Sequence, residues 1–182
     1  KVRVPVLIFA IFIALAPGCV EQDSGLEGGD MSISLISTAF RHDGQIPPKY
    51  TCDGDNVSPS LSWGEPPGNT RSIALICDDP DTPRNFTHWL VYNIPPDVTM
   101  LQENIPMGEL IEGRAMQGAN DFGDVGYGGP CPPSGSSHRY YFTLYALDTV
   151  VNLEAGATKQ QLENEMGGHV LGQGRLVGIY ER

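Results

Sequence analysis

The sequence is poor in basic residues and has no long hydrophobic run, and both absences restrict its function. It holds 11 Lys and Arg against 22 Asp and Glu, which gives a formal net charge of −11. Proteins that bind nucleic acid hold the phosphates with clustered Lys and Arg, so we expect no nucleic-acid partner. The uncharged apolar segment near the N-terminus, residues 4–16, is shorter than the about 20 residues that a membrane-spanning helix needs.

Motifs of several enzyme classes are also missing. Neither a G-x-S-x-G nucleophile elbow nor an H-E-x-x-H zinc motif occurs. In "DDPDTP", Thr82 directly follows Asp81, so the D-x-D-x-T spacing of aspartate phosphatases is absent. The tight turn from Asp79 to Asp81 leaves little freedom to hold two carboxyl groups about 5 Å apart around a sugar. We therefore expect no enzymatic activity and no cofactor, and a hydrolase or metal enzyme is the least favoured alternative.

The first thirty residues are typical of an export signal followed by a tether. Lys1 and Arg3 precede the apolar segment, and small residues lead from it to Cys19. The stretch "LAPGC" resembles a lipoprotein processing site, at which Cys19 becomes the lipidated N-terminus; a plain secretory signal cut near Gly18 is the alternative. Residues 19–30 are acidic, rich in glycine and without periodicity, which predicts a flexible tether.

These features predict an exported protein with a signal peptide over residues 1–18, a tether over 19–30 and one domain over 31–182. Loss of the signal removes two basic residues and no acidic residue, so 9 basic against 22 acidic residues leave a net charge of −13. A lipid on Cys19 would hold the domain on the outer face of the cytoplasmic membrane. Without that lipid, the protein would be secreted.

Three of the four cysteines lie in the expected domain, where export exposes them to an oxidising compartment. Cys77 ends the apolar run "SIALIC" and is typical of a buried side chain. Cys52 and Cys131 lie in loop-like segments with glycine and proline, which makes them the better candidates for a disulfide. No CxxC pair and no Cys/His spacing typical of zinc occurs, so we expect no metal site.

Turn-forming residues recur along the chain, with 22 Gly and 15 Pro, which favours short strands over a helical bundle. Segments rich in β-branched and aromatic residues predict five strands, at residues 32–37, 72–77, 87–94, 138–147 and 174–181. Thr158 and Gln161 form a capping-box pattern for one helix, and a helical turn at 107–113 is a weaker prediction. Without βαβ alternation, this pattern predicts a mostly β protein, an antiparallel sandwich or barrel with one or two short helices.

Two histidines lie at the entry of expected strands, each near a proline-rich loop. Side-chain alternation places His138 on one face with Tyr140. The same alternation places His88 on a face with three other side chains: Phe86, Leu90 and Tyr92. For a single histidine of this kind, a core residue satisfied by one hydrogen bond is the simpler alternative.

Two acidic residues of the turn before the His88 strand complete the candidate site. Asp79 and Asp81 have the same parity around Pro80, so both carboxylates can point into one cleft; an ordinary Asx-turn is the alternative. The segment "GGPCPPSG", residues 128–135, has prolines that fix its backbone and make it suitable as a rigid wall. The predicted pocket has no evident nucleophile, which is typical of a binding site.

Four motifs, taken in order, resemble the phosphatidylethanolamine-binding protein (PEBP) family in its prokaryotic Raf kinase inhibitor-like branch. They are "YTCDGDNVSPSLSW", "DPDTP" with the His88 strand, "YGGPCPPSG" and "HRYYFTLYALD", and the similarity runs from about Ser32 to the C-terminus. The resemblance implies a sandwich of two antiparallel sheets with a small anion pocket at one end. It implies that eight residues line this pocket: Asp79, Asp81, Pro83, His88, Pro132, Pro133, His138 and Tyr140.

The pocket and the resemblance together favour a non-enzymatic protein that binds a small phosphate-like anion or a phospholipid head group. We expect His88 and His138 to donate hydrogen bonds to the anion, with an aspartate nearby favouring their charged forms. The alternative is a protein-interaction regulator, such as a peptidase or kinase inhibitor, that acts through exposed loops. Residues 106–129 are the longest candidate loop for such a protein partner.

Overall fold

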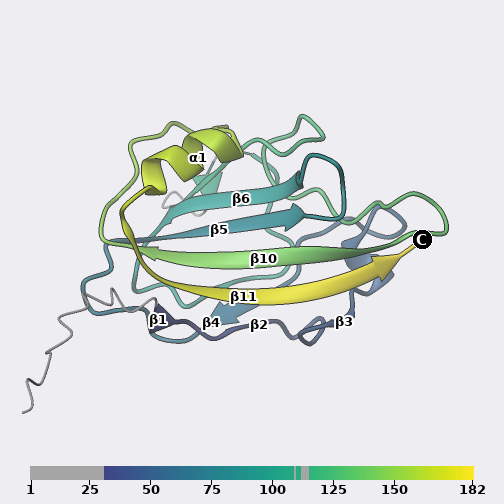
Figure 1. The fold of residues 1–182 in the computed structure, drawn as a ribbon, viewed down its shortest axis with the longest axis horizontal. Helices are drawn as coiled ribbons and strands as arrows, with labels where there is room; N and C mark the ends of the chain where they lie inside the picture. Colours follow the sequence, from purple (N-terminus) through teal and green to yellow (C-terminus); the bar gives the residue numbers. More distant parts are fainter. Residues whose placement is uncertain (1–30, 109, 112–114) are drawn as a thin grey trace, which may run out of the picture.

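The computed structural model describes residues 31–108, 110–111 and 115–182, so the expected signal, tether and Cys19 lie outside the described residues. Strands are the predominant regular structure, and one short α-helix accompanies them (Figure 1). The elements, in chain order, are β1 (Met31–Ser32), β2 (Leu35–Ile36), β3 (Gly44–Gln45), the 3-10 turn η1 (Pro48–Tyr50), β4 (Leu61–Trp63), β5 (Ser72–Asp79), β6 (Phe86–Ile94), β7 (Met100–Leu101), β8 (Leu110–Ile111), β9 (Ala115–Gln117), β10 (Ser137–Leu147), α1 (Lys159–Met166) and β11 (Val170–Glu181).

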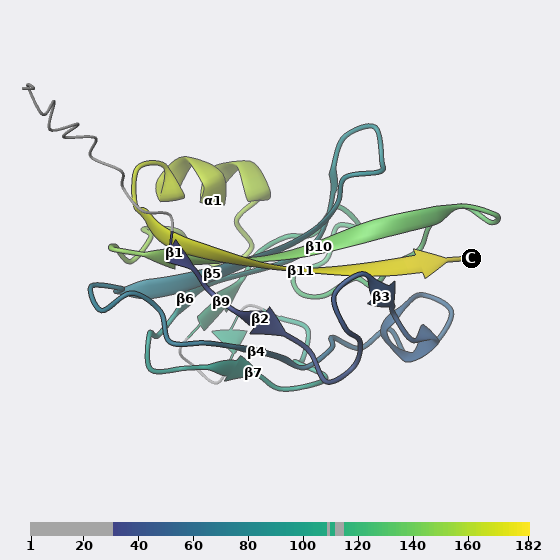
Figure 2. The ribbon, with the colours of Figure 1, turned by 60° about the horizontal axis from the view of Figure 1, so that its bottom comes forward.

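The strands form two sheets that pack face to face. The large sheet has the order β1-β11-β10-β5-β6-β9-β8, with β3 also paired to β11, and the small sheet has the order β2-β4-β7. Figure 2 shows the small sheet on one face of the large sheet and α1 on the other. The main core lies between the sheets and includes Trp89, Tyr140 and Phe142. A second core lies under α1, where Leu162 and Met166 pack.

The long central strands and the helix confirm the prediction of a mostly β sandwich. Strands β5, β6, β10 and β11 cover the four predicted segments from residue 72 onward. Thr158 caps α1: its side chain accepts a hydrogen bond from the backbone N–H of Gln161, whose own side chain accepts from the backbone of Thr158. The helix buries Leu162 and Met166, which lie one turn apart on the same face.

Other local predictions were wrong. The segment 32–37 forms two strands in different sheets, because Ile33 donates a hydrogen bond to Gln173 of β11 while Ser34 accepts one from Gly64 beside β4. Strands β1 and β3 also pair with β11 in parallel, so the large sheet is not wholly antiparallel. Within the segment 107–113, for which a helical turn was predicted, the described residues Leu110 and Ile111 form the strand β8, which pairs with β9. In the described part of the chain, no helix is long and apolar enough to cross a membrane.

A bulge in β6 gives His88 its special position. Cys77 of β5 lies opposite Trp89, and the next residue, Asp78, lies opposite Thr87. His88 therefore has no residue opposite it on β5. One extra residue in a strand reverses the alternation of side chains beyond it and bends the strand locally.

This bulge separates His88 from two of its predicted neighbours. Leu90 and Tyr92 pack in the core under α1. The ring of His88 instead contacts Tyr140 of the main core at 5.1 Å between centroids, and it keeps its contact with Phe86 at the same distance. The prediction that His88 shares a face with Leu90 and Tyr92 is therefore wrong, because simple alternation does not continue through a bulge.

Candidate ligand-binding site

A small cavity lies where four strand ends meet. Because β5, β6, β10 and β11 pair in antiparallel order, the last residues of β5 and β11 lie beside the first residues of β6 and β10. The loop before β10 closes the cavity from the side. The cavity has a volume of about 110 Å³ and is lined by Asp79, Thr82, Phe86, His88, Phe122, Cys131, Pro132, Pro133 and His138.

Asp79 and His138 form the polar centre of this cavity. Asp79 is 2 % exposed, and its Oδ2 accepts a hydrogen bond from Nδ1 of His138 at 2.7 Å. Its Oδ1 accepts the backbone N–H of Asp81 at 2.9 Å, so the Asx-turn and the cleft-directed carboxylate exist together. The bond to Nδ1 orients the imidazole of His138 and leaves Nε2 as the nitrogen that a ligand can use.

His88 has a different environment from His138. It is 3 % exposed, and its Nδ1 donates a hydrogen bond to the carbonyl of Gly128 at 2.6 Å. Burial lowers the pKa of His88, and this effect outweighs the opposite influence of the Gly128 carbonyl and of Asp79. His88 is therefore neutral near pH 7, with Nε2 as an acceptor. Asp79 favours the charged form of His88, as expected, but the burial of the ring has the larger effect.

Three residues predicted to line the cavity lie outside its lining. Asp81 accepts hydrogen bonds from the backbone N–H and Nε of Arg139 at 2.9 and 3.0 Å, and this guanidinium lowers the pKa of Asp81 to about 2. Pro83 is exposed in the turn between β5 and β6. Tyr140 is fully buried against His88, and its hydroxyl has no hydrogen-bond partner within the described residues. Burial raises the pKa of Tyr140 well above its usual value.

A disulfide fixes the wall of the cavity. Cys52 and Cys131 are bonded, with 5.4 Å between their Cα atoms, as the sequence favoured, and Cys77 is a free, buried thiol. The backbone N–H of Cys52 also donates to Pro130 at 3.1 Å. The next two residues of the wall, Pro132 and Pro133, both line the cavity. The wall is thus held by a covalent bond and by two rings that restrict its backbone.

Phe122 also lines the cavity, although no sequence pattern indicated it, and it comes from a loop and not from a strand. Its ring packs edge-on against Phe86, at 4.7 Å between centroids, and against His88 at 5.5 Å. Asn120 shapes the loop by accepting the backbone N–H of Phe122 at 3.0 Å. A Cβ on Gly128 would collide with the Phe122 ring, so glycine is required there for this packing. No local pattern signals such a contact between loop residues and a strand.

The hydroxyl and the sulfur that line the cavity are both engaged within the protein. The hydroxyl of Thr82 donates to the carbonyl of Asp79 at 3.0 Å and accepts the N–H of Phe86 at 2.9 Å, so it is already engaged. The sulfur of Cys131 is in the disulfide. Among the residues that the structure describes, no group of three or more His, Cys, Asp or Glu side chains is placed to hold a metal ion.

Comparison with known proteins identifies the family. The sequence model of the family described as phosphatidylethanolamine-binding protein matches residues 36–181. The chain belongs to this family. It is 54% identical over 151 residues to a UPF0098 protein of Methanothermobacter thermautotrophicus, a match that covers 82% of this chain and 99% of the relative. A UPF0098 protein of Pyrococcus horikoshii is 45% identical over 181 residues, covering 97% of this chain and 88% of the relative.

Solved structures agree with this assignment to the PEBP family. A putative PEBP homolog from Chlamydia trachomatis has a TM-score of 0.74 and 43% identity, covering 83% of this chain and 98% of the other. The E. coli protein YbcL, described as a new member of the mammalian PEBP family, has a TM-score of 0.76 and 30% identity, covering 83% and 99%. The resemblance seen in the sequence motifs is therefore confirmed, and so is the PEBP fold.

Proposed function

We propose that this PEBP-family protein is a non-enzymatic binding protein whose cavity takes a small phosphate-like anion, free or as the head group of a phospholipid. The observation that carries the proposal is the hydrogen bond between His138 Nδ1 and the buried Asp79 at the cavity. In the doubly protonated ring, Nδ1–H donates to the carboxylate and Nε2–H remains as a charged donor for an anion. The family description of phosphatidylethanolamine binding supports the same ligand class.

The two histidines have separate tasks in this proposal. The net charge of −11 repels anions at long range, so binding depends on donors inside the cavity. His138 supplies the charged donor, and its charge also balances the carboxylate of Asp79, which would otherwise repel the ligand. His88 stays neutral and accepts a hydrogen bond, which suits a protonated phosphate oxygen or a head-group N–H.

Replacing His138 with Ala is expected to weaken phosphate binding at least tenfold, because a hydrogen bond to a charged group contributes about 1.5–3 kcal/mol. Calorimetric titration with inorganic phosphate and phosphoethanolamine measures the change in affinity. Sulfate serves as a second anion whose charge does not depend on pH over the neutral range.

A matched control is available in the same chain. His169 also donates from Nδ1 to an aspartate, Asp148, at 2.7 Å, but this pair lies on the surface away from the cavity. His169→Ala should leave phosphate affinity unchanged. Equal phosphate affinities of the parent and His138→Ala would refute the mechanism.

Two exposed side chains in the segment 106–129, outside its strands β8 and β9, favour the second candidate function, regulation of a protein partner. Met107 is 54% exposed and Phe122 is 49% exposed, and exposed large apolar side chains are typical of contact surfaces. Under this alternative, the His138→Ala protein would keep its regulatory activity. Substitution of Met107 would remove that activity without affecting phosphate affinity.

We also propose that the protein is exported and anchored to the outer face of the cytoplasmic membrane by a lipid on Cys19. Each buried methylene of an acyl chain contributes about 0.8 kcal/mol, so two or more chains give stable attachment. Cys19→Ser should move the protein from the membrane fraction to the soluble fraction after ultracentrifugation. If the variant sediments with membranes as the parent does, lipid on Cys19 is not the anchor.

A further inference from the structure

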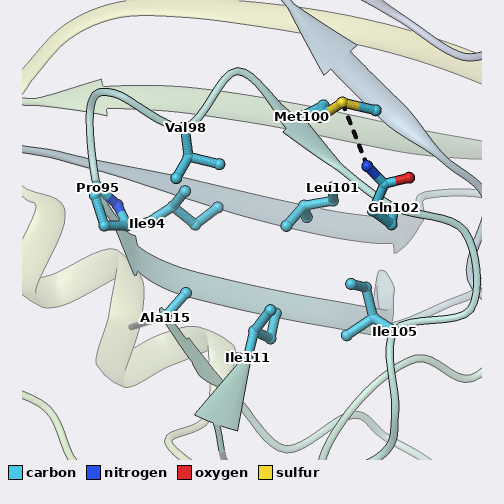
Figure 3. Close-up of a pocket in the computed structure, with 9 residues that line it drawn as sticks. All are labelled: Ile94, Pro95, Val98, Met100, Leu101, Gln102, Ile105, Ile111 and Ala115. Atoms are coloured by element: carbon cyan, nitrogen blue, oxygen red, sulfur yellow. Dashed lines mark hydrogen bonds between the residues drawn. The ribbon is translucent and has the colours of Figure 1, made fainter. Parts of the chain in front are cut away.

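A second cavity lies at the other end of the sandwich, far from the His138 site. It opens between the edges of the two sheets, where β7 faces the end of β6 and the β8–β9 pair (Figure 3). It has a volume of about 200 Å³. His88 lines the first cavity near the start of β6, and Ile94 lines the second cavity at the end of the same strand. The six residue steps from His88 to Ile94, at about 3.3 Å each, place the two cavities about 20 Å apart.

Most of the residues that line this cavity have apolar side chains. Four of them are buried members of the main core: Ile94 of β6, Leu101 of β7, Ile111 of β8 and Ala115 of β9. Their side chains face the cavity (Figure 3). Val98 packs against the same core from the loop before β7. The cavity is therefore an opening into the hydrophobic core, and an apolar group placed in it would continue the packing between the sheets.

The mouth of the cavity has a different composition from its floor. Met100 is 44% exposed there, and a methionine side chain adapts its shape easily to an apolar ligand. Gln102 is exposed beside it and supplies an amide group to the cavity (Figure 3). The amide nitrogen of Gln102 donates to the thioether sulfur of Met100 at 3.5 Å. A thioether is a weak acceptor, so an oxygen atom of a ligand would be a better partner for this amide.

The size of the cavity restricts its occupant to a small molecule. At about 30 Å³ for a water-sized group, 200 Å³ holds about six or seven such groups. A specific protein interface buries at least about 1,000 Å² in total, which is far more than this opening offers. A linear chain of about six carbon atoms with one polar end fits both the volume and the single amide.

We propose that this second cavity binds the alkyl chain of a small amphiphile, whose hydroxyl or carbonyl oxygen accepts a hydrogen bond from Gln102. The alkyl chain lies between Ile94, Leu101 and Ile111, in space that no side chain of the core fills. The site is independent of the anion cavity, because no residue lines both.

The test uses 1-alkanols from butanol to octanol as probes, titrated into the whole protein and followed by calorimetry and by the methyl NMR signals of methionine. Each added methylene should tighten binding about fourfold, as expected for a methylene moved out of water, until the cavity is full. The methyl signal of Met100 should shift with the same saturation curve. His138→Ala should bind the alkanols as the parent does, because the anion cavity takes no part.

Two variants fill the cavity from different sides. Ala115→Leu enlarges a side chain on β9, and Val98→Phe enlarges a side chain on the opposite wall. If one of these variants does not fold, the other still provides the test. Each should weaken 1-hexanol binding at least tenfold. The proposal is overturned if the parent shows no saturable binding, or if both filled variants bind as the parent does. It is also overturned if the parent is a dimer that the filled variants dissociate, since a second copy would then occupy the opening.

Discussion

Replacing Cys52 and Cys131 together by Ser is expected to lower the free energy of unfolding by about 4 kcal/mol. The two cysteines are 79 residues apart, and the entropy lost by the unfolded chain on cross-linking grows with the length of the loop. Urea denaturation followed by tryptophan fluorescence measures the change in midpoint. Trp89 is fully buried, so its emission reports loss of the main core.

The same double variant should also bind phosphate less tightly than the parent. Cys131 lines the anion cavity, and the two prolines that follow it form the adjoining wall. Without the disulfide, ordering this wall costs entropy at the moment of binding. A reductant should lower the free energy of unfolding of the parent to that of the double variant. The free energy of unfolding of the double variant should not change.

Cys77→Ala provides the control for this experiment. Its thiol is buried in the core and is not cross-linked, so any loss of stability in this variant comes from packing and does not depend on reductant. Equal urea midpoints for the oxidised parent and the double variant would contradict the prediction. A parent that titrates with three free thiols after unfolding, apart from Cys19, would show that the bond is not formed in solution.

Replacing Gln117 by Leu is the second change with a large expected effect, a loss of about 3 kcal/mol or more. Gln117 is fully buried in β9. Its side-chain oxygen accepts a hydrogen bond from Nε1 of Trp89 at 2.9 Å, and its amide nitrogen donates to the carbonyls of Pro106 and Gly108 at 2.9 and 2.8 Å. Leucine fills a similar volume but leaves the buried Nε1–H of Trp89 without a partner, which costs about 1–3 kcal/mol, and it also removes the hydrogen bonds of two part-buried carbonyls, each worth about 1 kcal/mol.

Gln160 offers a matched control for the Gln117 experiment. Its side chain lies on the exposed face of α1 and bonds to Asn164. Gln160→Leu should change the free energy of unfolding by no more than about 0.5 kcal/mol, as is usual for surface positions. If Gln117→Leu costs as little as Gln160→Leu, the buried hydrogen bonds of Gln117 do not stabilise the fold as argued.

The sequence alone was sufficient for features that depend on neighbouring residues. Four long strands and the helix that starts at Thr158 follow from patterns within about ten residues, and these formed where they were predicted. The ordered motifs around His88 and His138 were enough to indicate the family. The short strands β4, β7, β8 and β9 escaped prediction, because two or three residues carry too little pattern to be recognised.

The protonation and partners of the site residues were decided only by the tertiary structure. The sequence indicated both that Asp79 and Asp81 could share a cleft and that His88 and His138 could both be charged. In the fold, Asp79 contacts His138, whereas Asp81 pairs with Arg139 and His88 lies too deep to hold a proton easily. Which carboxylate meets which cation depends on the register of β10 against β5, and that register joins residues about sixty positions apart.

The face on which His88 lies, and the place of Phe122 in the cavity, were likewise beyond the reach of the sequence. A one-residue bulge in β6 reverses the alternation that the sequence pattern assumes, and it is defined only by pairing with β5. Phe122 reaches the cavity because Gly128 has no side chain to exclude its ring. Local patterns determine which segments become strands, but the composition of the site depends on contacts between segments, whose energies no single segment contains.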